Sequence, residues 1–212
     1  MNSNTTSFVT IMALTGLNCA GLEPSPAPTP IAAQPDPRVR VVPAEARVQL
    51  CEAHGILRVT EMMINPAATP DASSEYLELY NPGPDPVPLV GWTLRDGRHP
   101  QETLRTAHVI AGGAFAILAP SADKDANGDL EVDVVVERFT LPNRGGLIHL
   151  ENPCGESIVR FRYGARRPWP SLNSGAALEL RHPLRDPAEP RSWRSARAAL
   201  PSGDRGSPGR LR

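Results

Sequence analysis

Apolar and polar side chains alternate with a period of two through much of this chain, and this alternation restricts its possible folds more than any other feature. In residues 76–80, Leu77 and Leu79 fall on one side of an extended backbone, while Tyr76, Glu78 and Tyr80 fall on the other. Eight further short runs are rich in β-forming residues, at 57–64, 87–94, 106–110, 114–118, 132–139, 147–150, 158–163 and 177–180. The pattern predicts about nine strands.

Turn-forming pairs separate these runs. Asn-Pro at 65–66, Asp-Gly at 96–97 and Gly-Gly at 112–113 supply the preset or positive φ angles that close hairpins and corners. We expect helix only at residues 44–54 and near 192–200, and no amphipathic helix stands between the strands. Short strands in this arrangement favour an all-β fold, an antiparallel β-sandwich, over a βαβ fold.

The amino-terminal quarter has a different composition. Residues 1–19 contain an apolar run at 8–17 that suits a signal peptide, although the first cation is Arg38. Residues 20–55 are rich in proline and predict a disordered tether leading into the domain at 56–212. No run approaches the roughly 18 apolar residues of a membrane-spanning helix, which excludes an integral channel or transporter.

The first segment predicts export to the cell envelope, with Cys19 as a lipidated residue. Small residues surround Cys19, and a tether follows directly, as in many bacterial lipoproteins. The alternatives are an ordinary signal peptide cleaved nearby, leaving a secreted protein, or a misassigned start codon.

The three cysteines fit this interpretation. If Cys19 carries acyl chains, Cys51 and Cys154 are left to pair in an oxidising compartment. Two separate buried thiols remain the alternative, because sequence does not show whether the two backbones come within bridging distance.

Three ordered blocks resemble the lamin tail domain family as found in exported bacterial proteins. Residues 59–66 contain Glu61 and Asn65, residues 75–81 contain Glu78 and Asn81, and residues 89–94 contain Gly91 and Trp92. A later hairpin at 141–155 and a closing Gly-Ser-Pro-Gly at 206–209 extend the resemblance to roughly residues 57–209. It implies an immunoglobulin-like β-sandwich, and for such a module on an exported protein we predict adhesion, scaffolding or protein binding.

The physical character of the motif residues points to structure. Trp92 shares a strand face with Val90 and Leu94, so we expect a core anchor, and Gly91 leaves room for a bulge or a neighbouring backbone. Glu61, Glu75 and Glu78 are interpreted as solvated or salt-bridged strand residues, because none has a clear acid or base partner.

Catalytic motifs are absent from the sequence. The five histidines are scattered, and no metal-binding, nucleophile-elbow or phosphate-loop spacing occurs. His149 and Cys154 lie close together, but no catalytic-cysteine signature surrounds them. We therefore expect a non-enzymatic protein. An enzyme whose active-site residues are dispersed along the chain is a third possible function, because one sequence does not reveal such a site.

One acidic segment resembles a calcium-binding loop. Asp123, Asp125, Asn127, Asp129 and Glu131 place oxygen ligands at alternate positions, with Gly128 at the turn. Val134 stands where an EF-hand has glutamate, so Glu131, Asp133 or Glu137 would complete the shell. The prediction is a calcium site, and the alternative is a solvated acidic hairpin tip.

Charge is distributed unevenly along the chain. Residues 1–157 carry 10 basic and 19 acidic side chains, whereas residues 158–212 carry 12 basic and 4 acidic ones. The arginine-rich end could bind DNA or anionic lipid headgroups, which makes a nucleic-acid-binding module the alternative function. Arginine outnumbers lysine by 21 to 1, so the basic end could equally complement the acidic half of the same fold.

Overall fold

The structure of the protein, a computed structural model, describes residues 56–172 and 175–209. These residues belong to one compact unit, 40–212. The predicted signal-like segment, the tether, Cys19, Cys51 and the helix expected at 44–54 lie outside the described residues. Among the described residues, no helix is long and apolar enough to cross a membrane.

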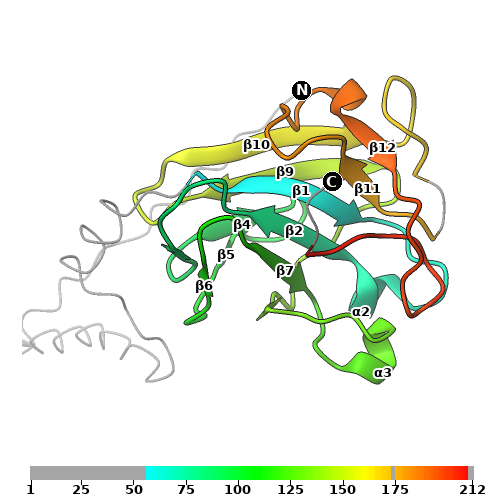
Figure 1. Cartoon of the computed structure of the whole chain (residues 1–212), viewed down its shortest axis with the longest axis horizontal. Coiled ribbons are helices and arrows are strands. Elements are labelled where there is room, and N and C mark those ends of the chain that lie inside the picture. The colour runs from blue at the N-terminus through cyan, green and yellow to red at the C-terminus, as the bar shows by residue number, and fades with distance from the viewer. Residues whose placement is uncertain (1–55, 173–174, 210–212) are drawn as a thin grey trace, which may run out of the picture. The chain divides into compact units, whose positions relative to one another are not determined.

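A six-stranded sheet forms one layer of the molecule (Figure 1). Its neighbours are antiparallel except for β7 and β8, which run parallel. In spatial order the strands are β12 (Trp193–Ser195), β11 (Leu178–Leu180), β1 (Arg58–Met63), β2 (Tyr76–Tyr80), β7 (Phe115–Ala119) and β8 (Val134–Val135).

A four-stranded antiparallel sheet forms the second layer. Its order is β10 (Ser157–Gly164), β9 (Gly145–Glu151), β4 (Thr93–Arg95) and β5 (Glu102–Thr103). A two-stranded ribbon pairs β3 (Val87–Pro88) with β6 (Val109–Ile110). The helical elements are single turns: α2 (Asp71–Ser74), α3 (Lys124–Asn127) and a 3₁₀ turn (Pro190–Ser192). The predicted all-β, immunoglobulin-like sandwich is confirmed.

The main core lies between the two sheets. Leu77 and Leu79 of β2 face Ile148 and Leu150 of β9, and all four are buried. Burying one such side chain contributes about 2 kcal/mol to folding. Trp92 is 3% exposed in this core, and its Nε1 donates to the Pro88 carbonyl at 2.9 Å. The period of two therefore directs the leucines inward.

The described residues form twelve strands where about nine were predicted: β5 and β12 were not foreseen, and the runs at 106–110 and 132–139 narrow to the two-residue strands β6 and β8. The run predicted at 87–94 is divided into β3 and β4, because Gly91 adopts φ +83° and a turn joins Trp92 N–H to the Leu89 carbonyl. The helix expected near 192–200 is wrong: the segment begins with a 3₁₀ turn and continues as β12. Trp193 is buried against Phe161, and this tertiary contact overrides local helix preference.

Candidate functional site

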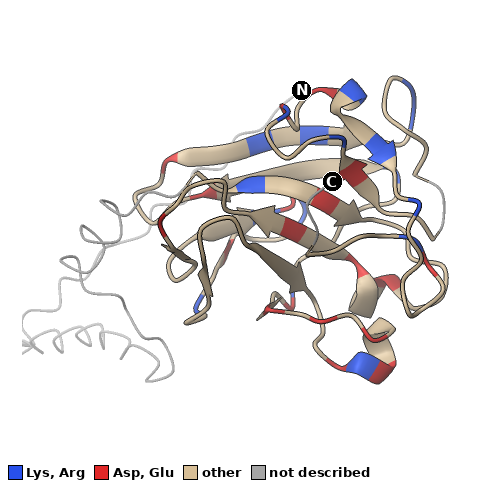
Figure 2. Ribbon diagram, in the orientation of Figure 1, with Lys and Arg blue, Asp and Glu red and all other residues tan. Residues whose placement is uncertain are grey.

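Three glutamates lie side by side on the outer face of the six-stranded sheet, turned away from the main core. Register pairs Glu61 of β1 with Glu179 of β11 on one side and with Glu78 of β2 on the other. Figure 2 shows this glutamate row crossing the three strands. A β-bulge between Val59 and Glu61 lets Glu61 follow Thr60 on the outer face.

All three members of the glutamate row are at most 4% exposed. Of the two states expected for Glu61 and Glu78, solvated or salt-bridged, burial shows that the solvated one is wrong. Glu75, which precedes β2, is buried as well and accepts a hydrogen bond from Leu141 N–H at 2.7 Å. The sequence does not show Glu61 and Glu78 to be buried, because the segment that covers them lies more than a hundred residues further along the chain.

The covering segment is residues 206–209, here called the C-terminal clasp. Ser207 N–H donates to Glu61 at 2.8 Å, its hydroxyl lies 2.9 Å from Glu179, and Gly209 N–H donates to Glu78 at 2.6 Å. A Cβ on Gly206 would lie 2.5 Å from the Tyr76 hydroxyl, so only glycine fits there. The motif at the end of the chain thus binds the motif glutamates near its start.

Side chains of the sheet complete the hydrogen bonding of the row. The Tyr76 hydroxyl donates to Glu61 at 2.6 Å, the Thr60 hydroxyl donates to Glu78 at 2.6 Å, and Arg194 Nε donates to Glu179 at 2.6 Å. Hydrogen-bonded partners of this kind are what allow acidic groups to be buried at all.

Burial changes the acidity of two glutamates. It raises the pKa of Glu78 to about 7, although hydrogen bonds from Thr60 and Gly209 oppose the rise. Burial likewise raises the pKa of Glu75 to about 7, against the hydrogen bond from Leu141. Both carboxyl groups therefore titrate near neutral pH.

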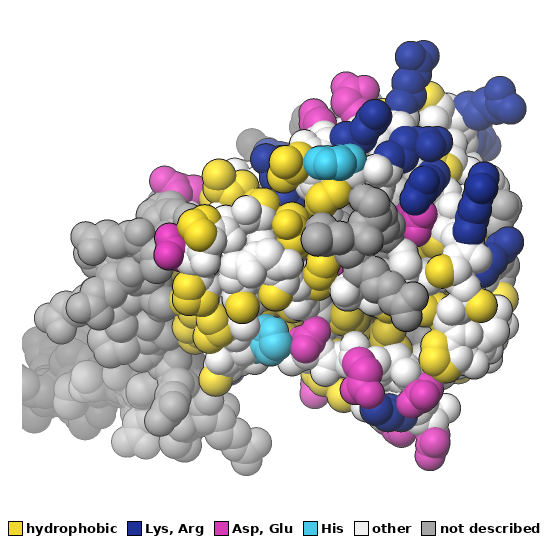
Figure 3. All heavy atoms as spheres, viewed as in Figure 1, with side chains coloured by type: hydrophobic (Ala, Val, Ile, Leu, Met, Phe, Trp, Pro, Cys, Tyr) yellow, Lys and Arg dark blue, Asp and Glu magenta, His cyan; other side chains and the backbone are white. Residues whose placement is uncertain are grey.

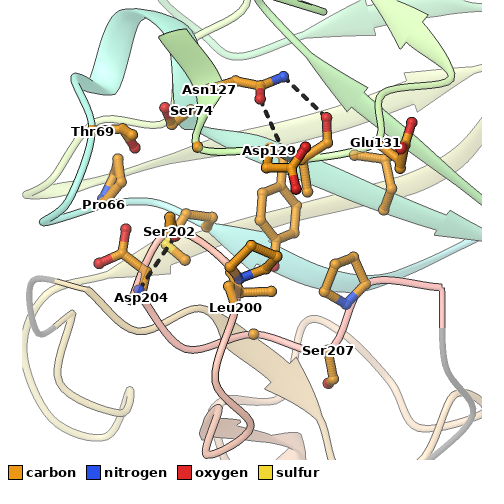
Figure 4. A pocket seen from close by; sticks show the side chains of 18 of the residues that line it. Pro66, Thr69, Ser74, Asn127, Asp129, Glu131, Leu200, Ser202, Asp204 and Ser207 are labelled. Atoms are coloured by element: carbon orange, nitrogen blue, oxygen red, sulfur yellow. Dashed lines mark hydrogen bonds between the residues drawn. The ribbon is translucent and has the colours of Figure 1, made fainter. Parts of the chain in front are cut away.

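A pocket of about 370 Å³ opens beside the glutamate row (Figure 4). We call it the outer-face pocket. Met63, Tyr76 and Ile117, from three strands of the sheet, form its floor, and Leu130 and Leu200 pack into the same apolar cluster. The walls come from the acidic turn, residues 123–133, and from residues 199–209.

The two walls touch at their base. A Cβ on Gly128 of the acidic turn would lie 2.6 Å from the Ser202 side chain, so glycine is required for this close approach. Asp204 anchors the opposite wall by accepting from the backbone N–H groups of Ala67 and Ala68 at 3.1 to 3.4 Å. These contacts show that the pocket is a built feature of the fold.

The acidic turn contains the five predicted calcium ligands. Asp123 caps α3 by accepting from Asp125 N–H, and Gly128 ends the helix in the left-handed region. Asn127 is buried; its amide donates to the Ser121 and Leu130 carbonyls and accepts from Leu130 N–H. Across the described residues, no three His, Cys, Asp or Glu side chains gather in an arrangement that could hold a metal ion. Calcium binding stays a prediction.

The rim of the outer-face pocket is acidic. Asp129 and Glu131 have side chains 64% and 84% exposed, and Lys124 forms ion pairs with both. The turn as a whole carries five carboxylates and one lysine. An apolar floor beneath a negative rim suits an apolar group attached to a cationic one.

His149, Ser157 and Glu151 make the nearest approach to a catalytic triad in the described part of the chain. His149 Nε2 lies 3.0 Å from the Ser157 hydroxyl and 3.4 Å from Glu151. A triad holds serine and carboxylate on opposite nitrogens of the imidazole ring, whereas here both meet the same nitrogen. Glu151 also pairs with Arg95 at 3.0 Å. The contact lacks the orienting carboxylate of a charge-relay site.

The remaining motif residues shape turns. Cys154, at the tip of the β9–β10 hairpin, is disulfide-bonded and so holds no free thiol. Cys51 lies outside the described residues, so its pairing stays a prediction. Asn81 is buried and holds the turn before β3 through the Asp85 and Ile110 carbonyls and Gly83 N–H. Asn65 lies at the turn after β1 and donates to the Leu172 carbonyl at 3.5 Å.

The arginine-rich end of the sequence forms a second surface. Arg167, Arg181, Arg191 and Arg194 line an open groove, here called the arginine groove, together with Trp169. The groove lies between edge strand β12 and the loop that follows β10. Figure 3 shows arginines gathered over the upper right of this face and a group of acidic side chains at its lower edge, with further acidic side chains elsewhere on the face.

These features define an immunoglobulin-like β-sandwich module whose two sheets carry a pocket on one outer face. The model of the Lamin Tail Domain family matches residues 52–165, more than half of the chain, and the protein belongs to that family. The matched region runs through β10 and stops before β11, β12 and the clasp. No curated protein matches the chain significantly.

The sequence pattern did not reveal Glu179, the contacts of Ser207 with the glutamate row or the outer-face pocket. Glu179 could have been found, because it stands between Leu178 and Leu180 in an alternating run and must face away from them. The contacts of Ser207 and the pocket depend on segments that are distant in the sequence, so no local pattern indicates them.

Proposed function

We propose that the protein is a non-enzymatic binding module of an exported bacterial lipoprotein, which serves adhesion or scaffolding by holding a protein partner at the outer-face pocket. The observation that supports this function is the pocket itself, with its apolar floor and acidic rim. The family supports a β-sandwich module, and the proline-rich tether would carry the domain away from a membrane anchored through Cys19.

The size and charge of the pocket indicate the kind of partner. About 370 Å³ accommodates one or two apolar side chains, which is the scale of an anchor residue in a protein interface. Asp129 and Glu131 at the rim favour lysine or arginine next to that anchor.

Peptide selection tests this function. A random peptide library is panned on the full chain, and the selected peptides are measured by fluorescence anisotropy. We expect peptides in which a basic residue adjoins an apolar one, with binding weakened at least about tenfold by Leu200→Arg, which places a bulky cation in the pocket. Val109→Arg is the matched control, because Val109 is an exposed apolar residue of β6 outside the pocket. Equal binding of the peptides by Leu200→Arg and by the wild type would show that the pocket is not the binding site.

Export and lipidation have their own test. Cells that produce the protein are fed radiolabelled palmitate and then fractionated. Label in the membrane fraction that disappears with Cys19→Ala supports the anchor, whereas soluble, unlabelled protein contradicts it.

The acidic turn is the proposed calcium site, and calorimetric titration of the full chain decides it. We expect heat and a raised melting temperature at millimolar calcium, with both lost in Asp125→Asn/Asp129→Asn. An absence of heat and of any melting shift in the wild type would show that the turn is a plain acidic tip.

Nucleic-acid binding is the second candidate function, and the arginine groove favours it. Among the described residues, Arg167 and Arg191 form no ion pair with a carboxylate, and Trp169 beside them offers an indole on which a base could stack. Retention of single-stranded DNA that falls steeply with salt and is lost in Arg167→Gln/Arg191→Gln would support it. Retention unchanged by these substitutions would exclude the groove.

A further inference from the structure

We propose that the protein associates with itself head to tail, the turn at residues 181–186 of one copy placing Leu184 in the outer-face pocket of the next. This inference rests on the proposed function, because it assigns a partner to the same pocket. The partner is a second copy of this chain.

The turn presents an exposed apolar residue between two cations. Leu184 is 58% exposed, and Arg181 and Arg185 on either side of it are exposed too. Within the described part of the chain, neither guanidinium forms an ion pair with a carboxylate. The turn therefore shows the combination of apolar anchor and positive charge that the pocket is suited to receive.

Hydrogen bonds fix the shape of the turn. Arg185 N–H donates to the His182 carbonyl at 3.0 Å, and Leu184 N–H donates to His182 Nδ1 at 3.2 Å. Asp186 accepts from Ala188 N–H at 2.9 Å, so its carboxylate is engaged within the turn. A preorganised turn loses little conformational freedom on binding, which favours association.

The pocket complements the turn in both polarity and charge. Ile117, Leu130 and Leu200 offer an apolar environment for the Leu184 side chain. Asp129 and Glu131 at the rim would meet Arg181 and Arg185. Because Lys124 is the single cation among five carboxylates of the acidic turn, the rim keeps a net negative charge.

The positions of the two surfaces require separate copies. The turn follows β11, which lies next to the β12 edge of the six-stranded sheet, whereas the acidic turn follows β7 near the other edge. Figure 1 shows the loop after β11 at the top and α3 at the bottom of the view. Contact between two different surfaces is heterologous, so it extends into chains or closes into a ring.

A single side chain in a small pocket makes a weak contact, and tethering would strengthen it. When many copies are anchored in one membrane, the effective concentration of the turn near each pocket is high. Such an assembly would give the module its scaffolding role.

Sedimentation velocity of the full chain tests the inference with a charge exchange. We expect the wild type to associate between about 10 µM and 1 mM at low salt, the range of a weak interface, and to dissociate at high salt. Leu184→Ser should weaken association at least about tenfold. Arg181→Glu/Arg185→Glu should be monomeric alone, as should Asp129→Lys/Glu131→Lys, while an equal mixture of the two should associate again.

The control variant is Arg160→Glu/Arg162→Glu, which makes the same charge change on exposed positions of β10. Melting curves establish that every variant is folded. A wild type that stays monomeric at 1 mM, a control that weakens association as much as the turn variant, or a folded mixture that fails to associate would each overturn the inference. Selection of pocket-binding peptides by a monomeric wild type would overturn self-association and leave the proposed function standing.

Discussion

At the scale of single residues, the most informative side chains are the buried acids. Glu61 and Glu78 belong to the opening motifs of the family, and their carboxylates hold backbone N–H groups of the clasp. Replacing a buried, hydrogen-bonded acid leaves its donors without partners, which costs about 1–3 kcal/mol for each donor. The motif glutamates are thus structural residues that join the two ends of the domain.

The raised pKa of Glu78 predicts how stability depends on pH. A carboxyl group that titrates at about 7 in the folded protein and near 4.5 when unfolded binds more protons in the folded state between these values. The free energy of unfolding should therefore fall as pH rises from about 4.5 to 7. The expected loss is about 1–3 kcal/mol for this group, with Glu75 acting in the same direction.

Urea denaturation at pH 5 and pH 8 measures this dependence. Glu78→Gln should flatten it, because glutamine carries no titrating proton, and Glu75→Gln/Glu78→Gln should flatten it further. Glu137→Gln, at an exposed position, is the control and should follow the wild type. If Glu78→Gln kept the full slope, Glu78 would not be the titrating group.

At the scale of elements, the C-terminal clasp buries the glutamate row on the outer face of the six-stranded sheet. It adds no strand, yet it covers the outer face with Gly206, Ser207 and Gly209. The family match ends before this segment. The segment that covers the glutamate row and forms part of one pocket wall therefore lies beyond the matched region.

Truncation tests the clasp. A chain ending at Arg205 should lose about 2–5 kcal/mol of unfolding free energy, because the glutamate row loses its hydrogen bonds from Ser207 and Gly209. A chain ending at Gly209 retains these groups and should resemble the full chain. Equal melting temperatures for the two truncated chains would show that the clasp adds no stability.

At the scale of the whole molecule, charge and covalent linkage set how the module can act. Arginines gather on one part of the surface and a group of acidic side chains lies at the lower edge of the same view (Figure 3), which favours head-to-tail contact while the formal net charge of the chain is −1. The disulfide of Cys154 fixes the tip of the β9–β10 hairpin.

Peptide mapping without reduction should find Cys154 joined to Cys51. Such a bond would link the chain ahead of β1 to the hairpin, and its loss in Cys51→Ser/Cys154→Ser should cost about 2–4 kcal/mol, because a long loop is released in the unfolded chain. Recovery of a free Cys51 thiol under oxidising conditions would contradict the pairing.

Local patterns were sufficient for the strands that bury one full face. Leu77 and Leu79 revealed β2 because side chains alternate strictly along a strand. Short segments were harder: β5 and β12 have two and three residues, too few to show a period, and Trp193 becomes a strand residue only through packing on the core. The single-turn helix α3 was not predicted, because its N-cap Asp123 and C-cap Gly128 are also residues of the pattern that resembles a calcium-binding loop.

The sequence by itself determined the all-β class, the family and the places of most strands along the chain, because alternation and turn chemistry act between near neighbours. Only the tertiary structure decided that Glu61, Glu78 and Glu179 are buried together, and that residues 123–133 and 199–209 enclose a pocket. Those outcomes depend on contacts between segments up to 146 positions apart, such as Glu61 with Ser207. The burial of a strand's outer face is set by whichever distant segment comes to lie on it.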